Sequence, residues 1–76
     1  MLKPHPNLTS PINPDGVPIF LNWNNLVVGT SVFIPALNMK LLKRQMTKEA
    51  AWRQVHVVGM ERIEGGKLGM RFWRVL

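Results

Sequence analysis

The final stretch of the chain, Val55 to Leu76, places the strongest constraint on its fold. It reads VHVVGMERIEGGKLGMRFWRVL, two β-prone runs separated by Gly65-Gly66. A two-glycine loop tolerates the positive φ angles that a primed hairpin turn requires. The stretch therefore predicts a β-hairpin folded about these two glycines.

The turn also predicts which hairpin residues face one another. Glu64 lies opposite Lys67, a favourable pair of opposite charges. Because side chains alternate between the two faces of a strand, the pairs that continue this register form one mostly apolar face. Two charged residues on it, Glu61 and Arg74, are expected at its edge or paired with each other. The further pairs are Ile63 with Leu68, Glu61 with Met70, Gly59 with Phe72, and Val57 with Arg74.

The opposite face of the hairpin is basic and aromatic. Arginine can bind phosphate with two donors and an exposed tryptophan can stack on a base, while the same two residue types dominate protein–protein hot spots. In an alternative interpretation, Trp73 and Met60 pack under the N-terminal segment as a second small core. The candidate binding residues on this face are His56, Arg62, Arg71 and Trp73, with Lys67 at the tip.

A helix is predicted from Met39 to about Gln54, where no glycine or proline occurs and Asn38 can serve as the N-cap. A helical wheel places Met39, Leu42, Met46 and Ala50 on one stripe, the expected core face. A break at Thr47 would instead give a helix-turn-helix. The cations expected to flank the hairpin's binding face are Lys40, Lys43, Arg44, Lys48 and Arg53.

Two further features of the helix bear on binding. Trp52 projects away from the core stripe, on the same side as Leu41, and is a candidate contact residue; alternatively it tucks under the next strand. Glu49 and Arg53 form an i,i+4 ion pair worth a few tenths of a kcal/mol.

The residues before the helix divide into an arm and the start of the domain. Residues 1–18 contain five prolines and predict an extended or disordered arm with a turn at Pro14-Asp15-Gly16. The arm is either a flexible terminus or an adhesive segment that orders on a partner, with Leu8 and Ile12 as anchors. Residues 19–76 form the single domain, with Trp23 in its core and a short strand at residues 31–34 ending before Pro35.

Charge is the most informative property of the composition. The 76 residues carry a net charge of +6, and residues 40–74 hold nine cations and three anions. Such an excess attracts polyanions or acidic protein surfaces, although it can also serve solubility alone. The absence of cysteine is compatible with a reducing cytoplasm, and asparagines and a proline interrupt the most apolar segment, which argues against a membrane span.

The sequence offers little for catalysis. Its two histidines, His5 and His56, lie in different contexts, no zinc-ligand spacing exists, and Asp15 is the only aspartate. Glu61 and Glu64 fall on opposite strand faces, so they do not form a paired-carboxylate site. We therefore expect a protein that is not an enzyme and that uses no cofactor and no metal.

Two segments resemble a group of short, mostly uncharacterised phage-encoded basic proteins. Leu26-x-x-Gly-x-Ser-Val-Phe-Ile-Pro35 is similar to their Val-Gly-x-Ser-Phe-Phe-Val-Pro strand, and Gly69-Met-Arg-Phe-Trp-Arg74 to their terminal Arg-Val-Trp-Arg-like strand. The resemblance covers residues 26–75; the helix lacks the group's Ala/Arg-rich spacing and glycine exit. It implies a phage origin, a β-α-β-β order and the cytoplasm of a bacterial host, but no activity.

Together these features predict a small α+β domain, a β-α-β-β arrangement in which an antiparallel sheet packs on one amphipathic helix. We expect a phage regulator that binds nucleic acid through the basic hairpin face and the helix flank. The alternative is an inhibitor that binds an acidic surface of a host protein, such as RNA polymerase or a nucleic-acid enzyme. Either would be a monomer or a weak homodimer without membrane contact.

Overall fold

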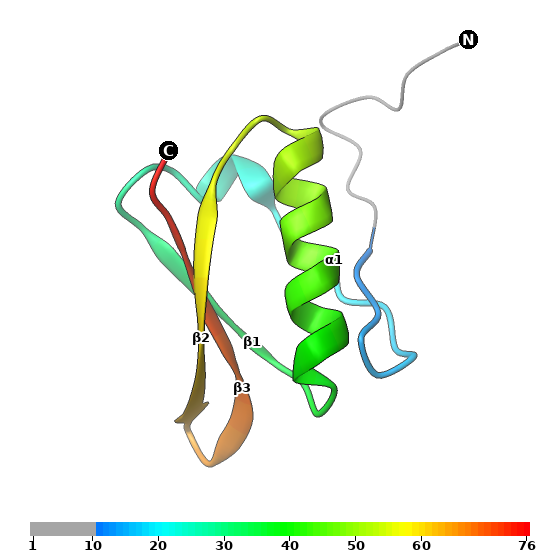
Figure 1. Cartoon of the computed structure of the whole chain (residues 1–76). Helices are drawn as coiled ribbons and strands as arrows, with labels where there is room; N and C mark the ends of the chain where they lie inside the picture. Colours follow the sequence, from blue (N-terminus) through cyan, green and yellow to red (C-terminus); the bar gives the residue numbers. More distant parts are fainter. Residues whose placement is uncertain (1–10) are drawn as a thin grey trace, which may run out of the picture.

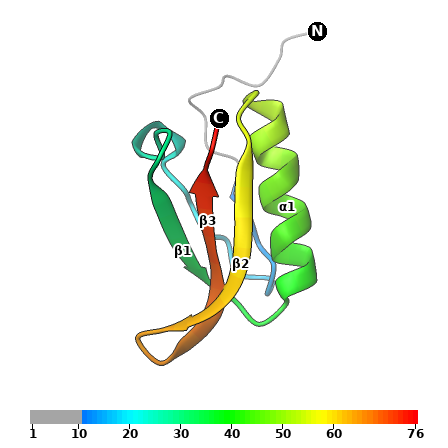
Figure 2. The same cartoon turned by 60° about the vertical axis from the view of Figure 1, so that its left-hand side comes forward.

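The computed structural model describes residues 11–76, which form one helix on one face of a three-stranded antiparallel sheet (Figures 1 and 2). This confirms the predicted α+β class. The sheet order is β1-β3-β2, so the first strand pairs with the last and both hairpin strands keep their predicted pairing. The elements are a 3-10 turn (Trp23–Asn25), β1 (Ser31–Pro35), α1 (Met39–Trp52), β2 (Val57–Glu64) and β3 (Lys67–Arg74).

The hairpin of β2 and β3 has the predicted register throughout, from Glu64 opposite Lys67 to Val57 opposite Arg74. Gly65 and Gly66 adopt φ angles of 58° and 77°, which explains why the turn needs glycine. The apolar face forms as predicted, with Phe72 buried. A Cβ at Gly59 would lie 2.6 Å from the Phe72 ring, so this glycine makes room for the largest of the fully buried side chains.

Helix α1 is continuous from Met39 to Trp52, so the helix-turn-helix alternative is wrong. The Asn38 side chain accepts a hydrogen bond from the backbone N–H of Leu41 at 3.1 Å, the predicted N-cap. The chain leaves the helix at Gln54, whose φ of 59° lies in the left-handed region. The predicted core stripe faces the sheet, with Leu42, Met46 and Ala50 buried and Met39 partly buried.

The described part of the predicted arm, residues 11–18, is folded onto the domain on the same side of the sheet as α1 (Figures 1 and 2). Ile12 exchanges two backbone hydrogen bonds with Ile19, at 3.0 and 2.7 Å. Its side chain is 3% exposed within the core that contains Trp23. The prediction that Ile12 anchors a partner is therefore wrong, since it packs in the chain's own core; Leu8 lies outside the described residues.

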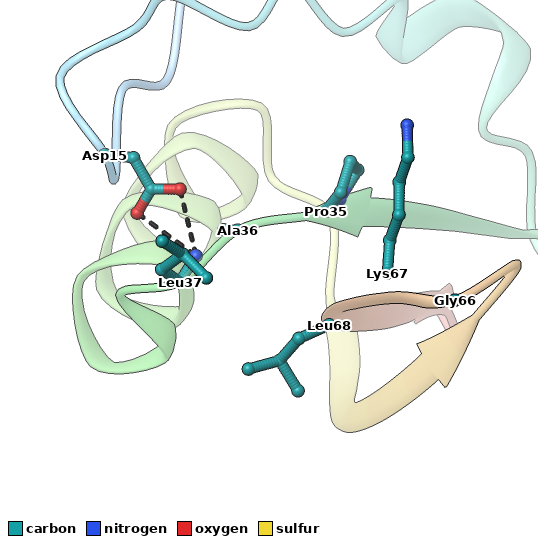
Figure 3. Close-up of a pocket in the computed structure, with 7 residues that line it drawn as sticks. All are labelled: Asp15, Pro35, Ala36, Leu37, Gly66, Lys67 and Leu68. Carbon is teal, nitrogen blue, oxygen red and sulfur yellow. Dashed lines mark hydrogen bonds between the residues drawn. The ribbon is translucent and has the colours of Figure 1, made fainter.

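Two polar contacts hold this segment against α1. Asn13 and the Gln45 side chain exchange a reciprocal pair of hydrogen bonds, at 2.8 and 2.9 Å. The predicted turn at residues 14–16 presents the Asp15 carboxylate, which accepts hydrogen bonds from the backbone N–H groups of Leu37 (Figure 3) and Asn38, each at 2.9 Å. Asp15 thus satisfies backbone donors just before the helix begins.

Candidate functional site

The fold divides the predicted binding residues between two surfaces. Helix α1 lies on one face of the sheet (Figure 2), and its cations Lys40, Lys43, Arg44 and Lys48 are exposed. The strand register places the basic and aromatic residues of the hairpin on the sheet's other face. The prediction of one surface made of hairpin face and helix flank is therefore wrong. We define the outer helix face as the surface formed by Lys40, Lys43, Arg44, Lys48 and Trp52. The outer sheet face comprises Ser31, Phe33, Val58, Met60, Arg62, Glu64, Lys67, Arg71 and Trp73.

The outer helix face carries a row of cations. Lys40, Arg44 and Lys48 follow i,i+4 spacing, which places successive charges on one side of the helix about 6 Å apart along its axis. These three side chains and Lys43 are exposed. Among residues 11–76 none of the four forms an ion pair, and the carboxylates of Glu49 and Glu64 bind other arginines.

Trp52 lies at the C-terminal end of this row, four residues after Lys48 on the same side of the helix. It remains 43% exposed, so it is available for contact and is not enclosed beneath β2. Leu41, near it in angle on the helical wheel, is half-buried. Trp52 adds an aromatic surface to one end of an otherwise cationic stripe.

Arg53, predicted as a binding residue, has a packing role instead. Its Nη1 donates to Glu49 Oε1 at 2.8 Å and to the Glu49 carbonyl at 3.1 Å. Its guanidinium lies 4.8 Å from the ring centroid of Trp23, a cation–π contact, and 10% of its side chain is exposed. The i,i+4 spacing predicted the ion pair with Glu49, but the contact with Trp23, thirty positions earlier, had no local sequence signal.

On the outer sheet face the two arginines share one carboxylate. The Glu64 carboxylate accepts hydrogen bonds from Arg71 Nε and Nη2 at 2.7 and 2.6 Å, and it lies 3.2 Å from Arg62 Nε. Arg71 also donates to Ser31 Oγ at 2.7 Å, and its guanidinium is 6.0 Å from the Phe33 ring centroid. Four donor atoms of the cluster are therefore engaged within the chain, and Glu64 offsets one of the two arginine charges.

Hydrogen bonding within this cluster shifts two proton equilibria. The Arg71 guanidinium lowers the pKa of Glu64 below its usual 4.5, and the charge of Arg62 acts in the same direction. Conversely, the hydrogen bond to Glu64 raises the pKa of Arg71. The sequence suggested Lys67 as the partner of Glu64. The alternative was already implicit in the predicted register, because Glu64 and Arg71 share a face.

The rest of the outer sheet face is apolar and aromatic. Val58 and Met60 are 46% and 56% exposed, and Phe33 and Trp73 are half-buried on the neighbouring strands. Among residues 11–76 no second small core forms on this face, because residues 11–18 pack on the other side of the sheet. Phe33 was not predicted as a surface residue; the alternation along residues 31–34 identifies its face once the pairing of β1 with β3 is known.

The remaining predicted residues lie near the two ends of the hairpin. His56 is exposed just before β2, and its backbone pairs with Val75 and Leu76. Lys67 is exposed at the tip, beside an open hollow of about 380 Å³ with a mainly apolar lining that also includes Asp15 (Figure 3). Two charged residues belong to the apolar face of the hairpin. Glu61 is exposed, and Arg74 donates hydrogen bonds to the Leu26 and Leu76 carbonyls.

Within residues 11–76 no three histidine, aspartate or glutamate side chains gather in a way that could hold a metal ion. The same part of the chain contains no helix of the length and apolarity needed to cross a membrane. Comparison with protein-family models, with curated proteins and with solved structures finds no match for this chain.

Proposed function

We propose that this protein is a non-enzymatic nucleic-acid-binding module and that it contacts the phosphate backbone through the outer helix face. The observation that carries this proposal is the row of exposed cations, Lys40, Lys43, Arg44 and Lys48, which lack acidic partners among residues 11–76. Polyanion binding gains free energy from counterion release, and this gain requires cations that are not already paired.

The geometry favours backbone contact over reading of base sequence. Lysine acts as a flexible point charge, and three of the four cations are lysines. Contacts of this kind position a protein on nucleic acid without specifying sequence. Trp52 at the end of the row provides a surface on which an unpaired base could stack. In the phage setting that the sequence resemblance implies, such a module would act as a regulator on the DNA or RNA it covers.

Salt dependence of binding tests the proposal directly. Affinity for a labelled mixed-sequence duplex, measured by fluorescence anisotropy, should fall with salt with a log–log slope of about −3 to −4 if four phosphates are neutralised. A paired change of Lys40→Ala and Lys48→Ala should make that slope shallower by about two. Arg62→Ala with Lys67→Ala removes the same charge from the outer sheet face and is the matched control.

Two outcomes would contradict the proposal. One is the absence of binding to duplex and single-stranded nucleic acid at about 50 mM salt, where electrostatic affinity is high. The other is an equal loss of affinity in the two paired variants, which would mean that binding follows total charge and does not use the outer helix face.

The outer sheet face favours a second candidate function, binding of a host protein. Four residues carry it: Val58 and Met60 are exposed, and Phe33 and Trp73 flank them. The neighbouring arginines already share the Glu64 carboxylate. Aromatic and methionine side chains with few free charges are typical of the centre of a protein interface. The partner class follows the earlier alternative, RNA polymerase or a nucleic-acid enzyme.

A pull-down from nuclease-treated host lysate tests this candidate. The wild-type chain should retain a discrete protein that Met60→Glu loses, while Lys43→Glu, at an exposed position of the outer helix face, keeps it. An empty wild-type lane, or equal retention by Met60→Glu, would exclude the outer sheet face as the binding surface.

A further inference from the structure

Strand β2 is an open edge of the sheet. In an antiparallel hairpin, alternate residues direct their backbone groups to the partner strand and away from it. The Glu64–Lys67 pair closes the turn, and the hydrogen bond from Val75 N to the His56 carbonyl marks the same set of β2 residues as facing β3. The other set therefore points its N–H and C=O groups outward. Its members are Val57, Gly59, Glu61 and Ile63.

The other edge of the sheet is much less available. Strand β1 has five residues and ends in Pro35, which has no N–H group to donate. Strand β2 has eight residues without proline, and among residues 11–76 no hydrogen bond from another segment reaches its outward backbone groups. An unprotected edge of this length can accept another strand.

We propose that β2 pairs with β2 of a second copy of this chain, antiparallel and centred on Met60. In this register Gly59 lies opposite Glu61 of the second copy, and both belong to the set with outward backbone groups. Val57 lies opposite Ile63, which is 73% exposed in the single chain and would gain an apolar neighbour. The two Met60 side chains meet on the two-fold axis.

Charge complementarity selects this register among its neighbours. Centred on Met60, the pairing sets His56 opposite Glu64 of the second copy and opposes no two like charges. A shift of the centre to Glu61 or to Arg62 places that residue directly opposite itself, which is unfavourable. A shift to Gly59 sets His56 opposite Arg62 and leaves Glu64 without a partner.

The dimer brings the two outer helix faces to one side. Opposed residues share a face in an antiparallel pair, and the proposed pairs join residues of the same face, so both copies of α1 lie on the same side of a continuous six-stranded sheet. The dimer itself rests on strand geometry alone. The dimer carries a basic surface with twice the cations of one chain. The role of this surface in binding nucleic acid rests on the proposed function.

A single cysteine in a chain that has none tests the register. A non-hydrogen-bonded antiparallel pair has a Cα–Cα distance of about 4.5 Å, within the range that a disulfide requires. In a glutathione redox buffer, Met60→Cys should therefore yield a disulfide-linked dimer, with oxidised glutathione taking the two electrons. Val58→Cys is the matched control, because the register separates its two copies by about 13 Å along the strand.

Sedimentation without nucleic acid tests the association itself, so its failure is distinct from a failure of nucleic-acid binding. The wild-type chain should dimerise with rising concentration. Glu61→Pro removes one outward N–H and should abolish the dimer, whereas Glu61→Ala keeps it; circular dichroism confirms that each variant is folded. A monomer at all concentrations, a dimer insensitive to Glu61→Pro, or equal cross-linking of Met60→Cys and Val58→Cys would each overturn the proposal.

Discussion

The outer helix face and the outer sheet face both contain cations and a tryptophan, but their cations differ in whether they are paired with a carboxylate. On α1 the side chains of Lys40, Arg44 and Lys48 are exposed, and within residues 11–76 they form no ion pair. On the sheet, Arg62 and Arg71 share Glu64, and the rest of the face is apolar and aromatic. A count of cations does not separate the two faces; the position of a few carboxylates does.

Charge reversal on the outer helix face should have the largest effect. The triple variant carries Lys40→Glu, Arg44→Glu and Lys48→Glu. Each change lowers the net charge by two, so the net charge falls from +6 to 0. Affinity for duplex DNA at low salt should fall by about 100-fold or more, because phosphate contacts become repulsions. Anisotropy titration measures it. Arg62→Glu with Lys67→Glu on the outer sheet face should reduce the affinity for duplex DNA much less. A similar loss of affinity would show that the two faces do not differ in DNA binding.

Lys48 in α1 and Arg53, the residue that follows this helix, should differ in their effect on stability. Arg53→Ala removes a side chain that packs on Trp23 and pairs with Glu49, and should lower the free energy of unfolding by about 1–2 kcal/mol. Lys48→Ala removes an exposed charge and should stay within about 0.5 kcal/mol of wild type. Urea denaturation compares them. An equal decrease in the free energy of unfolding of the two variants would show that the packing of Arg53 does not contribute to stability.

Removal of one carboxylate should make the outer sheet face resemble the outer helix face. Glu64→Gln frees Arg71 and Arg62, so affinity for a polyanion should rise by about three- to tenfold and the salt dependence should steepen. Glu61→Gln makes the same change in net charge outside the ion cluster and serves as the control. If both variants gain equally, the pairing of these arginines does not limit binding.

The smallest expected effect is on the pH dependence of stability. The folded-state pKa of Glu64 is lowered, so its ionised form stabilises the fold above the usual value of 4.5, and that stabilisation is lost as pH falls through the folded-state pKa. Urea midpoints between about pH 6 and pH 2.5 should therefore decrease less in Glu64→Gln than in wild type. Parallel curves for the two proteins would show that the pair with Arg71 adds no stability.

The elements that local chemistry determines were predictable from the sequence. Gly65-Gly66 sets the turn, and strict alternation from it gave every pair of the hairpin register. Asn38 and a residue run without glycine or proline gave the helix and its core stripe. In both cases the controlling residues lie within a few positions of the structure they control, so no knowledge of distant contacts was needed.

What the sequence did not reveal depends on contacts between distant residues. The docking of Ile12 into the core and the stacking of Arg53 on Trp23 join segments whose approach no local pattern encodes. The two separate surfaces follow from the same limit. Helical and strand periodicity identify which side chains share a face, but not that α1 covers one face of the sheet and directs its cations to the opposite side of the molecule.

The Asp15 carboxylate has a consequence for how the N-terminal segment can be observed. It binds the backbone amides of Leu37 and Asn38 from more than twenty positions away. Amide protons at a helix start exchange with solvent readily unless something holds them. The exchange rates of these two protons should therefore report how often residues 11–18 detach from the domain. Asp15→Asn would give the exchange rates of the same two protons without the carboxylate and leave the helix itself unchanged.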